Sequence, residues 1–87
     1  RLYKVIQGYA DLVYIEHPFV HIVEFKTRDF RGAVGQLLSY AQEFYNTPEF
    51  KPYTNLTIML HLVATKHDEA TEKLAAQHNI IYEIFEG

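Results

Sequence analysis

The chain has 87 residues, of which 48% are hydrophobic and 15% aromatic, and its formal net charge is −3. This length fits one domain, 1–87, and so apolar a composition excludes an intrinsically disordered chain. The absence of Cys excludes disulfides and thiolate metal sites. No apolar run approaches the roughly 18 residues that a membrane span needs. The negative charge counts mildly against a nucleic-acid partner, because phosphate neutralisation needs Lys and Arg.

Three segments in the first third of the chain are rich in β-branched and aromatic residues, which is typical of strands. They are Leu2 to Gln7, Ala10 to Glu16 and Phe19 to Thr27. Only His17-Pro18 separates the second from the third, and because Pro lacks a ladder N–H we expect a hairpin turn there. Folding about this midpoint pairs residues whose numbers sum to 35.

A helical pattern follows these strands. Asp29 can serve as the N-cap of a helix that begins near Phe30. Apolar residues then recur at helical spacing as far as Asn46-Thr47-Pro48. We expect the helix to end there and Pro48 to Thr54 to form a loop.

The last third of the chain reads as strand, helix and strand. Asn55 to Thr65 is a long apolar segment, which we expect to be a strand buried on both faces. A second helix is predicted over His67 to His78, with Asp68 as N-cap and Asn79 as C-cap. Ile80 to Phe85 is the final predicted strand. The order β-β-β-α-β-α-β implies an α/β domain with a mixed sheet and helices packed on it.

Three charged residues of the predicted hairpin carry the chemistry. Side chains alternate along a strand, so Glu24 and Lys26 project to the same face. In the register above Asp11 lies opposite Glu24, and directly paired side chains have Cβ atoms roughly 4.5–5.5 Å apart. Two such carboxylates repel each other unless a cation intervenes, and their oxygens suit a hard ion such as Mg²⁺ or Mn²⁺. Beside that ion, Lys26 could orient a water or offset charge developing on a phosphodiester. The plain alternative is a strand-end salt bridge between Lys26 and one acid, with the other acid solvated.

The order of the motifs resembles the PD-(D/E)XK nuclease superfamily. The chain has G-Y-A-D-L around Asp11, I-V-E-F-K-T around Glu24 and Lys26, and G-Q-L-L-S-Y around Gln36 and Tyr40. The last of these is similar to the Q-x-x-x-Y motif of the RecB-like branch. The segment L-V-A-T-K-H-D-E-A is similar to the region that follows this motif in archaeal-type structure-specific endonucleases.

This resemblance, which covers residues 8 to 86, implies a restriction-endonuclease-like fold. It implies that Asp11 and Glu24 are metal ligands, that the backbone carbonyl of Phe25 is a third ligand, and that Lys26 is the catalytic lysine. With Asp11, Glu24 and Lys26 as the catalytic residues, the implied activity is Mg²⁺- or Mn²⁺-dependent hydrolysis of DNA. The implied setting is an endonuclease of DNA repair, recombination or restriction, in the cytoplasm or associated with the nucleoid.

The chain departs from the family pattern at two points. Ala10 stands where the family name has Pro. Many members also carry another acid or a His on an N-terminal helix, for which there is no room before Leu2. Three explanations stay open: the chain is a fragment, another subunit completes the site, or the element is dispensable. The seven Tyr and six Phe suggest apolar surface that a homodimer would cover.

Four further residues are candidates for binding the DNA substrate. Gln36 and Tyr40 are four residues apart, so they share one face of the predicted helix. Arg28 and Arg31 lie between the catalytic strand and this helix, where phosphates could meet the helix N-terminus. The alternatives are an ordinary amphipathic helix edge for the first pair and solvated loop arginines for the second.

Two other functions fit the same sequence. One is a catalytically inactive member of the superfamily that binds nucleic acid or protein through the same fold. The other is an interaction domain without a nucleic-acid role, which the negative charge favours. The five His residues are scattered without the spacing of a zinc site, and in the assumed register His21 points away from the acidic cluster.

Overall fold

The computed structural model describes residues 2–4 and 10–86. Within these residues the elements are, in chain order, β1 (Leu2–Lys4), β2 (Leu12–Glu16), β3 (Phe19–Lys26), α1 (Phe30–Glu43), the 3-10 helices η1 (Phe44–Asn46) and η2 (Pro48–Tyr53), β4 (Thr57–Ala64), α2 (Glu69–Gln77) and β5 (Ile81–Ile84). None of these helices is long and apolar enough to cross a membrane.

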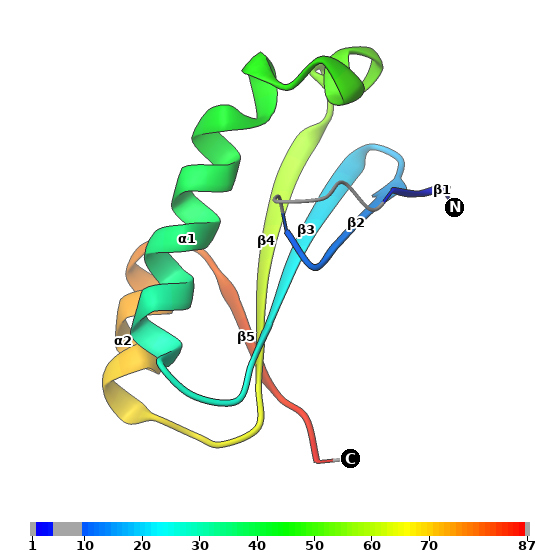
Figure 1. Ribbon diagram of the computed structural model, residues 1–87. Helices are drawn as coiled ribbons and strands as arrows, with labels where there is room; N and C mark the ends of the chain where they lie inside the picture. Colours follow the sequence, from blue (N-terminus) through cyan, green and yellow to red (C-terminus); the bar gives the residue numbers. More distant parts are fainter. Residues whose placement is uncertain (1, 5–9, 87) are drawn as a thin grey trace.

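The strands form one mixed sheet in the order β1-β2-β3-β4-β5 (Figure 1). β2 is antiparallel to both β1 and β3, whereas β3, β4 and β5 run parallel to one another. α1 connects β3 to β4, and α2 connects β4 to β5. Because crossovers between parallel strands are right-handed, both helices fall on one face of the sheet, where they contact each other (Figure 1). The predicted α/β architecture with a mixed sheet is confirmed.

From β2 onward the elements follow the order β-β-α-β-α-β. The first strand, expected over Leu2 to Gln7, is described only as the three residues of β1. Val5 to Gln7 lie outside the described residues.

The β2–β3 hairpin has the register that the sequence predicts. Leu12 pairs with Val23, so partner numbers sum to 35, and the turn falls at His17-Pro18, whose peptide bond is cis. Alternation then places one set of apolar side chains against the helices, where they are buried. These are Val13, Ile15, Val20 and Ile22.

The hydrophobic core lies between this face of the sheet and the helices. Phe44 and Phe50 are fully buried, and their rings stack with centroids 4.7 Å apart. Leu37 of α1 and Leu62 of β4 are also fully buried in the same cluster. Burying each such side chain stabilises the fold by roughly 1.5–3 kcal/mol. This packing holds α1 over β3 and β4 and fixes which side chains of the helix lie against the sheet.

Two expectations for the first helix are wrong in detail. α1 begins at Phe30 as predicted, but the Asp29 side chain makes no capping hydrogen bond. Its backbone is left-handed, with φ 54° and ψ 50°, whereas a capping side chain reaches the first turn from an extended backbone. α1 ends at Glu43 and the 3-10 helix η1 continues the helical backbone to Asn46, where the sequence predicts its end, whereas the expected loop Pro48 to Thr54 contains the 3-10 helix η2.

The second helix follows the prediction more closely. The Asp68 carboxylate accepts the backbone N–H of Thr71 at 3.1 Å and also its hydroxyl, so Asp68 is the N-cap. At the other end the C-cap is His78, and Asn79 follows it with φ 58°. An Asn tolerates this left-handed conformation, which ends the helix.

The expectation that β4 is buried on both faces is wrong. Leu60, Leu62 and Ala64 face the helices and are buried. The alternate residues, such as Met59 and Val63, are only partly buried. The reason is topological: α1 and α2 both lie on one face, and within residues 2–4 and 10–86 no helix covers the other.

Candidate functional site

The two acidic residues of the hairpin are held together by main-chain hydrogen bonds. Asp11 lies in a bend directly before β2, and its Oδ2 accepts the backbone N–H of Phe25 at 2.8 Å. In return, Oε1 of Glu24 accepts the backbone N–H of Asp11 at 3.4 Å. Each carboxylate is therefore anchored by the opposite strand. The structure brings Asp11 and Glu24 side by side, where the hairpin register places them.

The electrostatics of this pair are unfavourable. Glu24 is only 4% exposed, and burial raises the pKa of its carboxyl, with the neighbouring Asp11 charge as the next largest cause. A buried carboxyl beside a second one favours its protonated form, because two adjacent negative charges repel in a poorly solvated site. Asp11 is exposed, so the pair opens to solvent on that side. The site is thus a pair of acids that lacks a full counter-charge.

Lys26 supplies part of that counter-charge. Its Nζ lies 4.0 Å from Oε2 of Glu24, which is long for a direct ion pair. The lysine lowers the pKa of Glu24, but burial and Asp11 raise it by more. The alternative of a strand-end salt bridge therefore stays open: Lys26 pairs with Glu24, and the exposed Asp11 differs from it only in accepting the N–H of Phe25.

The backbone of Phe25 completes the edge of the cluster. The ring is 51% exposed on the opposite face of the sheet, whereas the N–H points to Asp11. The N–H and C=O of one strand residue point to the same side of the strand, so the carbonyl of Phe25 also points to the side of Asp11. The next carbonyl, that of Lys26, points the other way and accepts the N–H of Thr65 at 3.2 Å.

Helix α1 brings Tyr40 to the same cluster. Tyr40 is 8% exposed, and burial raises the pKa of its hydroxyl, followed by the charges of Glu24 and Asp11. A hydrogen bond with Gln36 acts in the opposite direction on this pKa. Tyr40 is therefore near enough to the acids for their charges to raise its pKa, whereas Gln36, its hydrogen-bond partner, is exposed.

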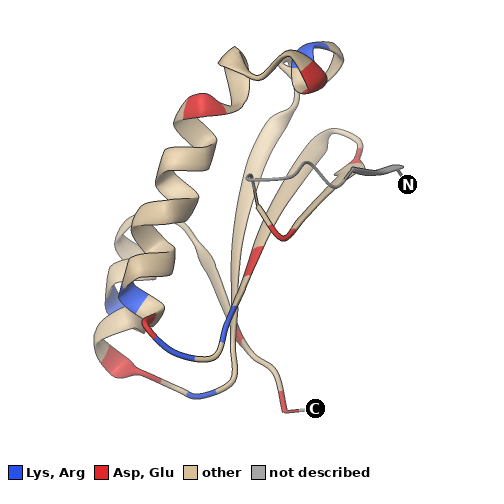
Figure 2. Cartoon of the chain, viewed as in Figure 1, with Lys and Arg blue, Asp and Glu red and all other residues tan. Residues whose placement is uncertain are grey.

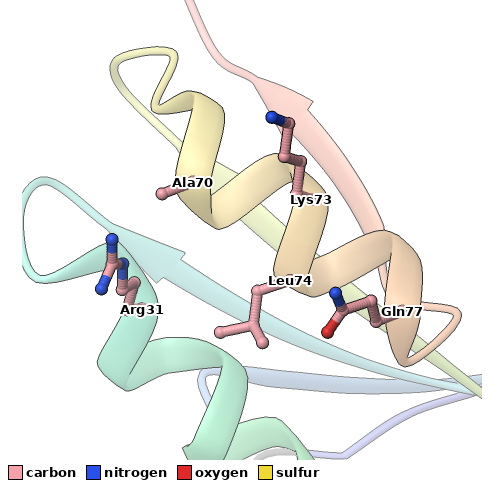
Figure 3. A pocket seen from close by; sticks show the side chains of 5 residues that line it. All are labelled: Arg31, Ala70, Lys73, Leu74 and Gln77. Atoms are coloured by element: carbon pink, nitrogen blue, oxygen red, sulfur yellow. The ribbon is translucent and has the colours of Figure 1, made fainter.

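Within the described residues, Arg28 and Arg31 form no ion pair with Asp11 or Glu24. Arg28 is exposed in the loop between β3 and α1. Arg31 lines a shallow groove of about 280 Å³ between α1 and α2, together with side chains of α2 (Figure 3). Leu74 points from α2 toward α1 across this groove, which makes its floor apolar (Figure 3). The groove does not include Asp11 or Glu24, so it is separate from the acidic cluster.

The donor set of the cluster fits one kind of ion. In the part of the chain that the structure describes, no three or more His, Asp or Glu side chains are placed to hold a metal together. Asp11 and Glu24 therefore supply two carboxylates, with the carbonyl of Phe25 as the third protein oxygen. Mg²⁺ is typically held by one or two carboxylates with waters and substrate phosphates, and not by an all-protein cage. The residues present fit such a hard cation.

A polar row on the other face of the sheet could not be read from the sequence. Nδ1 of His21 lies 2.7 Å from Nε2 of His61, and the His21 ring stacks on Tyr14 with centroids 4.3 Å apart. Glu16 lies 3.3 Å from His21 Nε2, close enough for an ion pair although the geometry makes no hydrogen bond. Glu83 lies 4.0 Å from His61 Nδ1. Burial, and then His21, lower the pKa of His61. Finding this row requires the parallel β3–β4 register.

No protein-family model matches the sequence, and no curated protein or solved structure matches the chain. The class of site is therefore defined by its own chemistry. It is a pair of carboxylates at the end of a hairpin, with a lysine on the same strand and a tyrosine from the covering helix.

Proposed function

We propose that this chain is a divalent-metal-dependent DNA nuclease of the PD-(D/E)XK type, in which Asp11, Glu24 and Lys26 are the catalytic residues. The observation that carries the proposal is the mutual anchoring of Asp11 and Glu24, with Glu24 nearly fully buried and Lys26 on the same strand. Burying the Glu24 carboxyl beside a second acid costs free energy that a purely structural role does not require.

The arrangement favours a divalent cation as the missing counter-charge. One oxygen of each carboxylate accepts a backbone N–H, so an ion would be held through Oδ1 of Asp11 and through Oε2 of Glu24, which Lys26 approaches to 4.0 Å. The carbonyl of Phe25 is directed to the same side as Asp11. When bound, Mg²⁺ or Mn²⁺ would polarise a phosphodiester and lower the pKa of a water.

The protein's own residues have distinct tasks in this proposal. Asp11 and Glu24 hold the ion in place through their anchored carboxylates. Lys26 stabilises negative charge on the scissile phosphate, because its ammonium is close to Glu24 yet not neutralised by it. Tyr40, with Gln36 beside it, positions Glu24 and Lys26 from the helix side. The charges of Glu24 and Asp11 raise the pKa of the Tyr40 hydroxyl.

The architecture supports the same proposal. A mixed sheet with the order β-β-α-β-α-β from β2 onward, and a Tyr40 whose pKa Glu24 and Asp11 help to raise, are compatible with a restriction-endonuclease-like fold that has a Q-x-x-x-Y helix. We propose an endonuclease of DNA repair, recombination or restriction, which acts on DNA inside the cell. Arg28 and Arg31 are proposed as substrate contacts outside the metal centre, and a homodimer as the active form.

A second candidate is an inactive relative that binds DNA or protein. It is favoured by the donor set, which within residues 2–4 and 10–86 contains two acidic side chains and not three. Such a domain would bind Mn²⁺ weakly or not at all and would leave DNA intact.

Incubation with DNA separates the two candidates. Supercoiled plasmid should be nicked in Mn²⁺ and left intact with a chelator, and both Asp11→Asn and Glu24→Gln should abolish nicking. Glu49→Gln is the matched control, because Glu49 is an exposed acid of η2 outside the cluster. Intact plasmid after prolonged incubation in Mn²⁺ would favour the inactive relative.

A further inference from the structure

The loops that follow β3 and β4 run side by side. Lys26 pairs with Ala64 at the last position of the parallel ladder. One residue further on, the backbone N–H of Thr65 donates to the carbonyl of Lys26 at 3.2 Å. The Thr65 hydroxyl donates to the carbonyl of Thr27 at 3.5 Å. The two segments of the chain therefore stay hydrogen-bonded for one residue beyond the end of the sheet.

Arg28 and Lys66 lie in the loops that leave these two strands. Each is two residues past the pair formed by Lys26 and Ala64, in a bend of its loop. Paired strands are about 4.8 Å apart, so the two loops begin close enough together to meet the same stretch of a phosphate backbone. Figure 2 shows Lys and Arg in the loops after β3 and β4, with Asp and Glu nearer the starts of the two helices that follow.

The backbone around Lys66 is fixed from the other side as well. The hydroxyl of Tyr82, on β5, donates to the carbonyl of Lys66 at 3.1 Å and accepts the N–H of Asp68 at 3.0 Å. The carboxylate of Asp68 is engaged in capping Thr71. The acid nearest in sequence to Lys66 is thus turned to the helix.

The side chains of Arg28 and Lys66 are exposed. Neither forms an ion pair or a side-chain hydrogen bond with any residue in the described ranges. Lys73, by contrast, pairs with Glu69 at 3.4 Å. Two unpaired cations on braced neighbouring loops, adjoining Lys26, form a surface that suits an extended polyanion.

We propose that Lys66 is a DNA-phosphate contact, which with Arg28 directs the backbone next to the scissile phosphate across the loops after β3 and β4. The inference rests on the proposed nuclease function and deepens it by adding a residue 40 positions from Lys26 in the sequence. Lysine acts here as a point charge, so the contact is independent of base sequence. It contributes to affinity and to its salt dependence, and not to metal binding.

The test is the salt dependence of DNA binding, measured by fluorescence anisotropy of a labelled duplex without divalent metal so that no cleavage occurs. The matched control is Lys51→Gln, because Lys51 is an exposed cation of η2. Lys51 precedes the eight-residue strand β4 and Lys66 follows this strand. The length of β4 therefore separates the two lysines by roughly 26 Å, at about 3.3 Å per residue.

We expect Lys66→Gln to weaken binding and to reduce the slope of log K against log salt by about 0.9, the loss of one phosphate contact on duplex DNA. Lys51→Gln should behave as wild type, and Mn²⁺ binding should be unchanged in both. If the wild type binds DNA and Lys66→Gln matches Lys51→Gln, the contact is wrong while the nuclease proposal stands. If the wild type binds no DNA under any salt condition, the proposed function fails, and this contact fails with it.

Discussion

Asp11 and Glu24 are joined across the open end of the β2–β3 hairpin by two hydrogen bonds that both use the main chain. Oε1 of Glu24 accepts the N–H of Asp11 at 3.4 Å, and Oδ2 of Asp11 accepts the N–H of Phe25, the residue after Glu24, at 2.8 Å. The two carboxylates are therefore held adjacent by the main chain, with the Lys26 ammonium 4.0 Å from Oε2 of Glu24. Such preorganisation lowers the cost of binding an ion, because little ordering remains to be done.

The first prediction concerns the stability of this arrangement without metal. The pKa of Glu24 is raised in the fold, so the stability associated with the group is full below its ordinary value of 4.5 and is lost as pH rises through the raised value. Glu24→Gln should remove this loss, because an amide keeps the acceptor for Asp11 and adds a donor. We expect the free energy of unfolding at pH 7 to rise by roughly 0.5–2 kcal/mol, measured by urea denaturation in a chelator.

The control for this prediction is Glu49→Gln, which removes the same charge from an exposed position. It should leave the free energy of unfolding within about 0.5 kcal/mol of wild type. Equal effects of the two substitutions would mean that net charge, and not the buried pair, sets the difference.

A second prediction follows from the histidine pair on the other face. The pKa of His61 is lowered by burial and by His21, with Glu83 acting weakly in the opposite direction. Stability from a base whose pKa is depressed is present above its ordinary value, near 6.5, and is lost as pH falls through the depressed value. We expect Tm to fall from pH 7.5 to pH 5 in the wild type, and to fall less in His61→Gln. The exposed His78 gives the control, His78→Gln, in which the pH dependence should match wild type.

The third prediction separates Tyr40 from the metal ligands. Tyr40→Phe removes a nearly buried hydroxyl that lies near Glu24 and hydrogen-bonds with Gln36. Loss of this hydrogen bond should lower the free energy of unfolding by about 0.5–1.5 kcal/mol. Mn²⁺ affinity should stay within about threefold of wild type, while kcat for DNA cleavage falls. Tyr45→Phe, at a position 58% exposed, should change neither quantity. A large loss of Mn²⁺ affinity in Tyr40→Phe would assign the hydroxyl to the metal centre itself.

The hairpin half of the site was predictable because its information is local. A Pro-containing turn at His17-Pro18 and strict alternation set the register, and that register brings Asp11 to Glu24. In one respect the structure differs from the predicted strand pairing of Asp11 with Glu24. Pairing ends at Leu12, and the carboxylate of Asp11 takes the place of a strand partner for the N–H of Phe25.

What the sequence could not supply depends on contacts between distant segments. The parallel β3–β4 register brings His21 and His61 into contact and joins the starts of the loops that carry Arg28 and Lys66. The expectation of a strand buried on both faces failed for the same reason. Apolar content in β4 does not reveal that both crossovers fall on one side of the sheet.

The most direct test of the metal centre is a calorimetric titration of the chain with Mn²⁺. We predict one ion per chain. At a pH below the raised pKa of Glu24, binding releases the carboxyl proton, so the measured enthalpy varies with the ionisation enthalpy of the buffer. Asp11→Asn should weaken binding roughly tenfold or more, since a neutral amide is a poorer ligand for a hard cation. Lys26→Ala should bind Mn²⁺ as tightly as wild type or more tightly, because a repelling charge has gone, and yet cleave DNA slowly. Binding that is absent in the wild type, or equal in wild type and Asp11→Asn, would contradict the assignment of Asp11 and Glu24 as its ligands.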